Sequence, residues 1–173
     1  MAEWDKLGER RIRDGYRAII GRRYRLPSGL EREFEIKLEA DTAVVLAVTE
    51  DGRVVLVREF RPGLEVELCE LPGGAIEDGE DAIAAARREL LEETGFAGEL
   101  EHAGTTVDCA YSTRMRHVFT VRGARRVAEP KPEAGEAPEV VLVSVGEFRE
   151  HLRSGRLTDV GPGYLALDRL GLL

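Results

Sequence analysis

The sequence predicts an α/β protein in which a mixed β-sheet is covered by helices on both faces. Two continuously apolar runs, residues 44–48 and 54–57, indicate strands at the centre of a sheet. A long segment rich in alanine and leucine, at about 79–94, shows helical spacing, and two further helical patterns close the chain. Because strands flank one central helix and helices follow at the end, we expect helices on each side of the sheet.

The individual elements follow from turn signals and from the period of the apolar residues. Hairpins are predicted at a Pro-Ser-Gly turn, residues 27–29, and at an Asp-Gly turn, residues 51–52. Asp78 or Gly79 can cap the start of the central helix, and Gly95 supplies a left-handed residue at its end. The other strands are predicted at 99–107, 116–123 and 139–145, and the last two helices at 145–152 and 162–170.

Composition bounds the class of protein. The 173 residues suffice for one domain, spanning 1–173, that needs no covalent staple, and we read residues 128–138 as a long loop within it. Cys69 and Cys109 form no CxxC pair, and no apolar run reaches the ~18 residues of a membrane span, so we expect a cytoplasmic protein away from membranes. A net charge of −8 argues against nucleic acid as a partner but not against a small phosphate compound, since metal ions can bridge an acidic site to an acidic ligand.

Three glutamates on the central helix need a neutralising partner. Glu89, Glu92 and Glu93 share one arc of the helix, beside a stripe of Ile83, Ala86 and Leu90 that we predict to face the core. Such carboxylates either form a solvated surface with nearby arginines or bind hard divalent cations, Mg²⁺ above all. Their spacing alone leaves both readings open.

A longer pattern surrounds the three glutamates. Its fixed positions are Gly74, Glu80, Arg88, Glu89, Leu90, Glu92, Glu93, Gly95 and Phe96. This pattern matches the signature of the Nudix hydrolases, so the chain resembles that family. The resemblance implies a Nudix-type α/β/α sandwich with an N-terminal β extension at 1–38 and the signature, or Nudix box, at 74–96.

The resemblance also implies chemistry. Glu89, Glu92, Glu93 and the carbonyl of Gly73 would hold Mg²⁺, for which Mn²⁺ could substitute, and Glu80 and Arg88 would form an ion pair that orients the box. One carboxylate would accept a proton from the attacking water. Glu92 is one predicted catalytic residue.

The second predicted catalytic residue is Glu136. The pattern Glu-any-any-Glu-aliphatic-aliphatic at 136–141 resembles the segment that supplies an acidic residue in related enzymes, with Glu133 as the next choice. A solvated acidic loop is the alternative reading.

The segment VVLVREFRPGLEVELCELPGG, residues 54–74, resembles the ADP-ribose pyrophosphatases and other nucleoside diphosphate sugar hydrolases. By that resemblance Arg61 would contact a substrate phosphate and Glu70 would lie near the site. The alternative for Arg61 is an ordinary charge at a strand end. A homodimer is also implied, because the N-terminal sheet of such enzymes often exchanges between subunits.

One segment departs from the ADP-ribose pattern. Where those enzymes usually show Ser-Pro-Gly-any-Ser-any-Glu, this chain has Asp-Cys-Ala-Tyr-Ser-Thr-Arg at 108–114. These changes alter the backbone conformations open to a loop that is expected to lie over the substrate. Arg114 also places a positive charge where those enzymes have a glutamate. Tyr111 and Arg114 are therefore predicted to bind the nucleotide or sugar, although Tyr111 could instead be a packed loop aromatic.

The expected activity is Mg²⁺-dependent cleavage of the pyrophosphate bond of a nucleoside diphosphate sugar such as ADP-ribose. The products would be a nucleoside monophosphate and a sugar phosphate. Two alternatives stay open: a Nudix hydrolase of nucleoside triphosphates or dinucleoside polyphosphates, and a ligand-binding module without catalysis.

Overall fold

The chain forms two compact units in the computed structural model, which describes residues 3–131 and 138–173. The first unit comprises Met1–Asp41 and Val107–Met115, and the second comprises Thr42–Thr106 and Arg116–Leu173. The segment Val107–Met115 therefore belongs to the N-terminal unit, although the residues before and after it belong to the second. No helix in the described part of the chain is long and apolar enough to cross a membrane.

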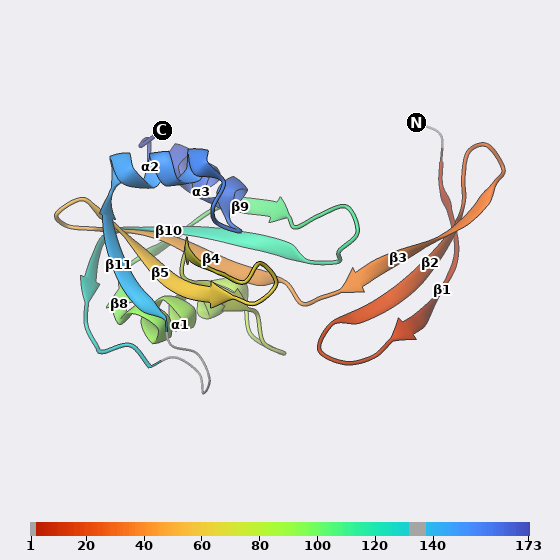
Figure 1. Ribbon diagram of the computed structural model, residues 1–173, viewed down its shortest axis with the longest axis horizontal. Helices are drawn as coiled ribbons and strands as arrows, with labels where there is room; N and C mark the ends of the chain where they lie inside the picture. Colours follow the sequence, from red (N-terminus) through yellow and green to blue (C-terminus); the bar gives the residue numbers. More distant parts are fainter. Residues whose placement is uncertain (1–2, 132–137) are drawn as a thin grey trace. The chain divides into compact units, whose positions relative to one another are not determined.

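The first unit is a three-stranded antiparallel sheet in the order β1-β2-β3 (Figure 1). Its strands are β1 (Asp5–Arg13), β2 (Ala18–Arg25) and β3 (Glu31–Leu38). The predicted turn between β2 and β3 is confirmed, since Gly29 adopts a φ of 81° and its N–H donates to the Leu26 carbonyl at 2.8 Å. Strand β1 was not predicted as a separate element. It is an exposed edge strand with many charged residues, so it lacks the apolar alternation that would identify it.

The second unit is built on an eight-stranded mixed sheet. Strand β4 pairs in parallel with β10 and antiparallel with β5, and the path through the sheet is β11-β5-β4-β10-β8. The remaining strands join it at the sides: β6 pairs with β5, β7 with β4 and β9 with β10. The strands are β4 (Thr42–Thr49), β5 (Arg53–Arg61), β6 (Val66–Glu70), β7 (Gly73–Ala75), β8 (Phe96–Ala97), β9 (Leu100–Val107), β10 (Met115–Arg126) and β11 (Glu139–Ser144).

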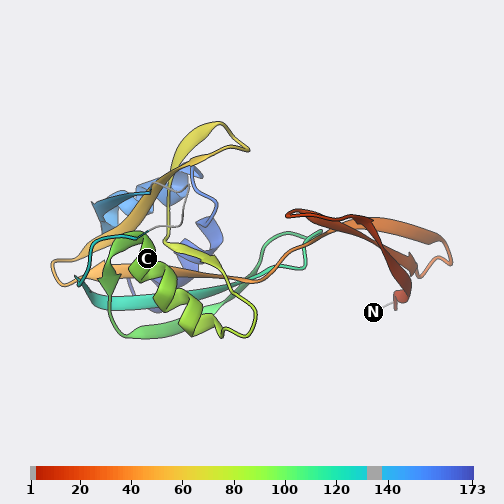
Figure 2. The same ribbon diagram turned by 90° about the horizontal axis from the view of Figure 1, so that it is seen from below.

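Helices cover both faces of this sheet, as predicted. They are α1 (Ala82–Thr94), α2 (Val145–Ser154) and α3 (Val160–Arg169). Successive residues of β4 point to opposite faces. Val45 lies in one apolar cluster with Leu90 of α1, whereas Leu46 lies in a second cluster with Phe148 of α2 and Leu167 of α3. Figure 2 shows α1 lying along its face of the sheet, and the α/β/α sandwich is confirmed.

Candidate functional site

Helix α1 carries the three glutamates and is capped at both ends. Its N-cap is Asp81, whose Oδ1 accepts from the Ala84 N–H at 2.7 Å, so the prediction of Asp78 or Gly79 as the cap was wrong by two to three residues. Gly79 instead takes a φ of 83° in the preceding turn, a conformation that suits glycine. The predicted end is confirmed, because Gly95 is left-handed with a φ of 73°.

The buried stripe of α1 matches the predicted one only in part, since α1 buries Ala85, Ala86, Leu90 and Thr94. Ala86 and Leu90 are buried as expected, but Ile83 is 37% exposed. Ala85 is fully buried. The buried stripe is thus shifted toward the arc that carries the glutamates, so these carboxylates leave the helix beside the sheet.

Two of the glutamates lie against the glycines of β7. The Gly73 N–H donates to Glu93 Oε2 at 2.9 Å. A Cβ added at Gly74 would lie 2.3 Å from Glu89 Oε1, and one added at Gly73 would lie 2.3 Å from the Ala43 carbonyl oxygen of β4. The missing side chains therefore allow strand, helix and carboxylates to meet at one place.

Arg88 is the cation of this cluster. Its Nη1 lies 2.8 Å from Glu89 Oε1 and 3.4 Å from Glu92 Oε2, so one nitrogen faces both carboxylates. The other side of the guanidinium pairs with Glu80 through Nε at 3.1 Å and Nη2 at 3.0 Å, which confirms the predicted ion pair. Nη2 also donates to the Ala75 carbonyl at 3.1 Å. The hydrogen bond to Glu80, opposed by burial and reinforced by Glu89, holds the pKa of Arg88 above its ordinary value.

The donor set of this cluster fits a hard divalent cation. Carboxylate and backbone oxygens are the ligands that Mg²⁺ and Mn²⁺ prefer. Because Gly74 has no side chain, the Glu89 carboxylate fits beside β7 in a space that a Cβ would fill. Within residues 3–131 and 138–173, no three His, Cys, Asp or Glu side chains are already gathered as ligands of one ion. The Arg88 guanidinium supplies the positive charge that faces Glu89 and Glu92.

Arg61 and Glu70 form a second cluster in the same unit. Glu70 is fully buried at the end of β6, three residues before Gly73, and its Oε2 accepts a short hydrogen bond from Arg61 Nε. The Glu70 Oε1 accepts from the N–H of Thr158 at 3.0 Å and from its hydroxyl. Burial lowers the pKa of Arg61, but the charge of Glu70 and its hydrogen bond outweigh burial and leave that pKa raised. The structure therefore brings these two predicted site residues into contact, and Thr158 bonds to the Glu70 carboxylate that joins them.

Two residues that the sequence did not reveal extend this second cluster. Asp159, which is 4% exposed, accepts a short hydrogen bond from Arg116 Nη1 of β10. Burial raises the pKa of Asp159 to about 6, and the opposing effect of the Arg116 guanidinium does not offset it. Residues 116 and 159 lie 43 positions apart, so no local pattern marks them as partners.

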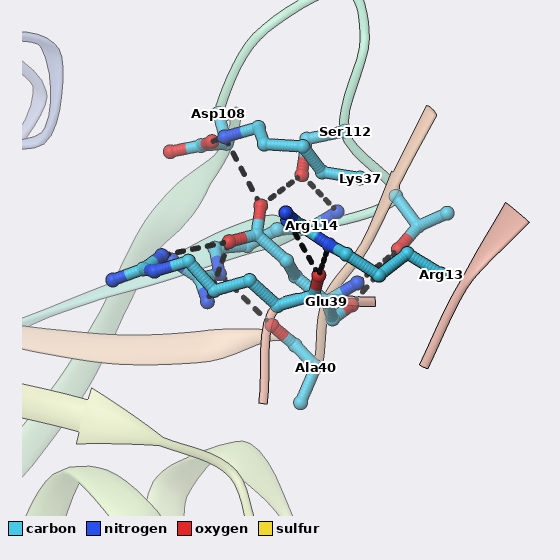
Figure 3. A network of polar contacts seen from close by, with 9 residues as sticks. Arg13, Lys37, Glu39, Ala40, Asp108, Ser112 and Arg114 are labelled. Carbon is cyan, nitrogen blue, oxygen red and sulfur yellow. Dashed lines mark hydrogen bonds and ion pairs between the residues drawn. The ribbon is translucent and has the colours of Figure 1, made fainter. Parts of the chain in front are cut away.

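Tyr111 and Arg114 belong to the first unit, where they lie beside the end of β3. The Tyr111 carbonyl accepts from the Lys37 N–H at 2.8 Å, and its side chain is 55% exposed. Arg114 Nε donates to the Ala40 carbonyl at 3.0 Å, and Nη2 lies 3.5 Å from Glu39 Oε1 (Figure 3). Their substrate contacts stay predictions. Glu136 and Glu133 lie outside the described residues.

Comparisons with known proteins agree with this geometry. The model of the NUDIX domain matches residues 38–159. An ADP-ribose pyrophosphatase of Bacillus subtilis (strain 168) is 30% identical over 142 residues, covering 80% of this chain and 77% of the relative. An ADP-sugar pyrophosphatase of Mus musculus is 39% identical over 147 residues, covering 75% of this chain and 67% of the relative.

A solved structure shares the fold. The crystal structure of an ADP compounds hydrolase superposes with a TM-score of 0.81 over 99% of this chain and 97% of that one, at 18% identity. At this identity the likeness shows the fold alone. The family model and the similar relatives together show that the chain belongs to the Nudix hydrolase family.

Proposed function

We propose that this Nudix hydrolase cleaves the pyrophosphate bond of a nucleoside diphosphate sugar such as ADP-ribose, with Mg²⁺ as its cofactor. The observation that carries the proposal is the cluster on α1, in which Glu89 and Glu93 lie against the glycines of β7 while Glu92 faces Arg88. The names of two relatives, an ADP-ribose pyrophosphatase and an ADP-sugar pyrophosphatase, support the substrate class.

The cluster would hold the cation through Glu89, Glu92, Glu93 and the Gly73 carbonyl. A divalent cation bound there offsets the repulsion between carboxylates and pyrophosphate and stabilises charge on the phosphate oxygens. Mn²⁺ has the same preference for oxygen ligands and is expected to substitute.

In the reaction, the oxygen of water bonds to one phosphorus and the bond from that phosphorus to the bridging oxygen breaks. The bridging oxygen leaves with the other phosphate, which gives a nucleoside monophosphate and a sugar phosphate. A carboxylate takes one proton from the water. Glu92, whose side chain is 42% exposed, is open to solvent and is one candidate for this base. Glu136 is the other. Arg61 is proposed to bind a phosphate oxygen from its place beside Glu70.

A substrate panel tests the proposal. Phosphate release, coupled to a phosphatase that attacks only monoesters, is measured from ADP-ribose, GDP-mannose, UDP-glucose and nucleoside triphosphates, each with Mg²⁺ and with chelator. We expect metal-dependent release from a nucleoside diphosphate sugar above the rest. Preference for triphosphates would overturn the substrate class, and no release from any compound would favour a binding module.

The same assay tests the α1 cluster. Glu93→Gln keeps an oxygen near the Gly73 N–H but removes the charge, so turnover should fall by at least about 100-fold, since even outer-shell partners of metal ligands are worth roughly 10–100-fold. Glu99→Gln, at an exposed glutamate beyond the helix, is the control and should leave turnover unchanged. Equal turnover in the Glu93 variant and the wild type at saturating Mg²⁺ would contradict the assignment of Glu93.

The homodimer and the cytoplasmic location are kept as predictions. Sedimentation of the purified chain would decide the first.

A further inference from the structure

The carboxylate of Glu39, just after β3, is almost fully buried and is surrounded by cations. Its side chain is 6% exposed. Oε2 lies 3.1 Å from Lys37 Nζ, whereas Oε1 lies 3.5 Å from Arg114 Nη2 and 3.6 Å from Arg17 Nη1 (Figure 3). A buried charge is costly unless it is paired and hydrogen-bonded. These contacts therefore make Glu39 the anion around which the local structure is arranged.

The partners of Glu39 come from distant parts of the sequence. Ser112 Oγ donates to Glu39 Oε2 at 2.9 Å, across 73 positions of the chain. The hydroxyl of Thr113 accepts from the Glu39 N–H and donates to the Glu39 carbonyl, each at 2.9 Å. Both the side chain and the backbone of Glu39 thus hold residues 112–114.

Lys37 reinforces the same attachment from β3. Its Nζ lies 3.2 Å from Asp108 Oδ2, and its backbone pairs in parallel with Ser112. The Lys37 N–H donates to the Tyr111 carbonyl at 2.8 Å, and the Thr113 N–H donates to the Lys37 carbonyl at 3.0 Å. The segment Val107–Met115, which connects β9 to β10, is therefore fastened to the end of β3.

The charges explain why one carboxylate can organise this cluster. Burial acts to raise the pKa of Glu39, but the hydrogen bond from Ser112 and the cations Lys37 and Arg114 outweigh it and leave that pKa lowered. Glu39 is therefore ionised at neutral pH. A neutral side chain of the same shape would keep the packing and lose the attraction to three cations.

We propose that Glu39 is a positioning residue for substrate selection. Its carboxylate fixes the segment Val107–Met115 and with it the directions of Tyr111 and Arg114. The inference rests on the proposed function and on the prediction that these two side chains contact the nucleotide sugar. Glu39 itself touches neither substrate nor reacting atoms. It acts through the segment that it holds.

Hydrogen exchange tests the positional part without any substrate. In Glu39→Gln, the amides of Thr113 and Arg114 should exchange about tenfold faster or more, the effect expected when hydrogen bonds to a charged group are weakened. Peptides from α1 should not change. Glu33→Gln is the matched control, since Glu33 lies in β3 itself but pairs with Arg10 and not with residues of the segment Val107–Met115. Unchanged exchange in Glu39→Gln, or an equal rise in both variants, overturns the proposal.

Kinetics test the selection part. With the preferred nucleotide sugar, Glu39→Gln should raise KM about tenfold and change kcat by less than about twofold, because binding and not chemistry is affected. The ratio of kcat/KM between the best and second-best sugars of the panel should fall. Faster exchange with an unchanged KM and an unchanged ratio would make Glu39 purely structural and overturn its part in selection.

A second variant guards against a folding defect. Ser112→Ala leaves Glu39 in place and removes two hydrogen bonds of Ser112 Oγ, the one donated to Glu39 and the one accepted from the Arg114 N–H. The Thr113 amide, which donates to the Lys37 carbonyl, is therefore the readout, and its exchange and KM should rise by a smaller factor than in Glu39→Gln. A wild type that turns over none of the panel would overturn the proposed function and the selection part together. Exchange would still decide whether Glu39 holds the segment.

Discussion

Two clusters of charged side chains lie in the second unit, and each depends on particular residues. Arg88 faces the box carboxylates with one nitrogen and Glu80 with the rest of its guanidinium. Asp159 lies in the other cluster, near Glu70 and paired with Arg116. Both arrangements gather carboxylates around an arginine. Asp159 is almost fully buried, and burial is why its pKa rises.

The stability of the protein should therefore depend on Asp159 in mildly acidic solution. Between about pH 4, where an unfolded Asp titrates, and about pH 6, the folded state holds a proton that the unfolded state has lost. Stability due to this group then falls as pH rises through that window and levels off above it. Chemical denaturation from pH 4 to pH 7 should show a smaller fall for Asp159→Asn than for the wild type.

Asp168→Asn is the control for this measurement, because Asp168 is an exposed carboxylate on α3, the helix that follows Asp159. The unfolding free energy of Asp168→Asn should change with pH in parallel with that of the wild type. If the two variants showed the same dependence of unfolding free energy on pH, proton uptake by the buried carboxyl of Asp159 would be ruled out.

At the scale of elements, α1 depends on its cap and on the glycines of β7. Asp81 satisfies the Ala84 N–H, and Gly74 lets Glu89 approach the strand. The helix is thus fixed at its start by a local contact and along its side by a contact with β7.

Removing the cap should destabilise the fold measurably. Asp81→Ala is expected to cost about 1 kcal/mol, which lowers Tm by about 2–4 °C in a chain of this size. Asp78→Ala removes the acid that the sequence suggested and should leave Tm unchanged. Thermal unfolding of the two variants compares them directly, and a larger loss for Asp78→Ala would place the cap earlier than the structure does.

At the scale of the whole molecule, cation binding should be visible as stability. A ligand that binds only the folded state stabilises it by about 2.7 kcal/mol at 100 times its Kd. For a chain of this length the rise in Tm is about 5–10 °C. Thermal unfolding with Mg²⁺, and again after chelator is added, should show this rise and its reversal.

The α1 glutamates should account for that rise. Glu93→Gln should lose most of it, whereas Glu99→Gln should keep it. If Mg²⁺ raised the Tm of both variants equally, the cation would bind at another part of the molecule. If it did not raise the Tm of the wild type, that result would count against Mg²⁺ as the cofactor.

The sequence by itself determined the sandwich class, the position of α1, its glycine end and the box residues. These features depend on local information: apolar period, turn glycines and the spacing of charges along one helix. The Glu80–Arg88 pair was implied by the resemblance to the Nudix signature, and its members lie eight positions apart in one segment.

Only the tertiary structure decided which distant residues meet. Glu70 bonds to Thr158 across 88 positions, and Glu39 bonds to Ser112 across 73. The exposure of Ile83 and the edge strand β1 were likewise decided by what packs against them. Such contacts arise when the folded chain brings separate segments together around buried charges, and no periodicity within either segment encodes its partner.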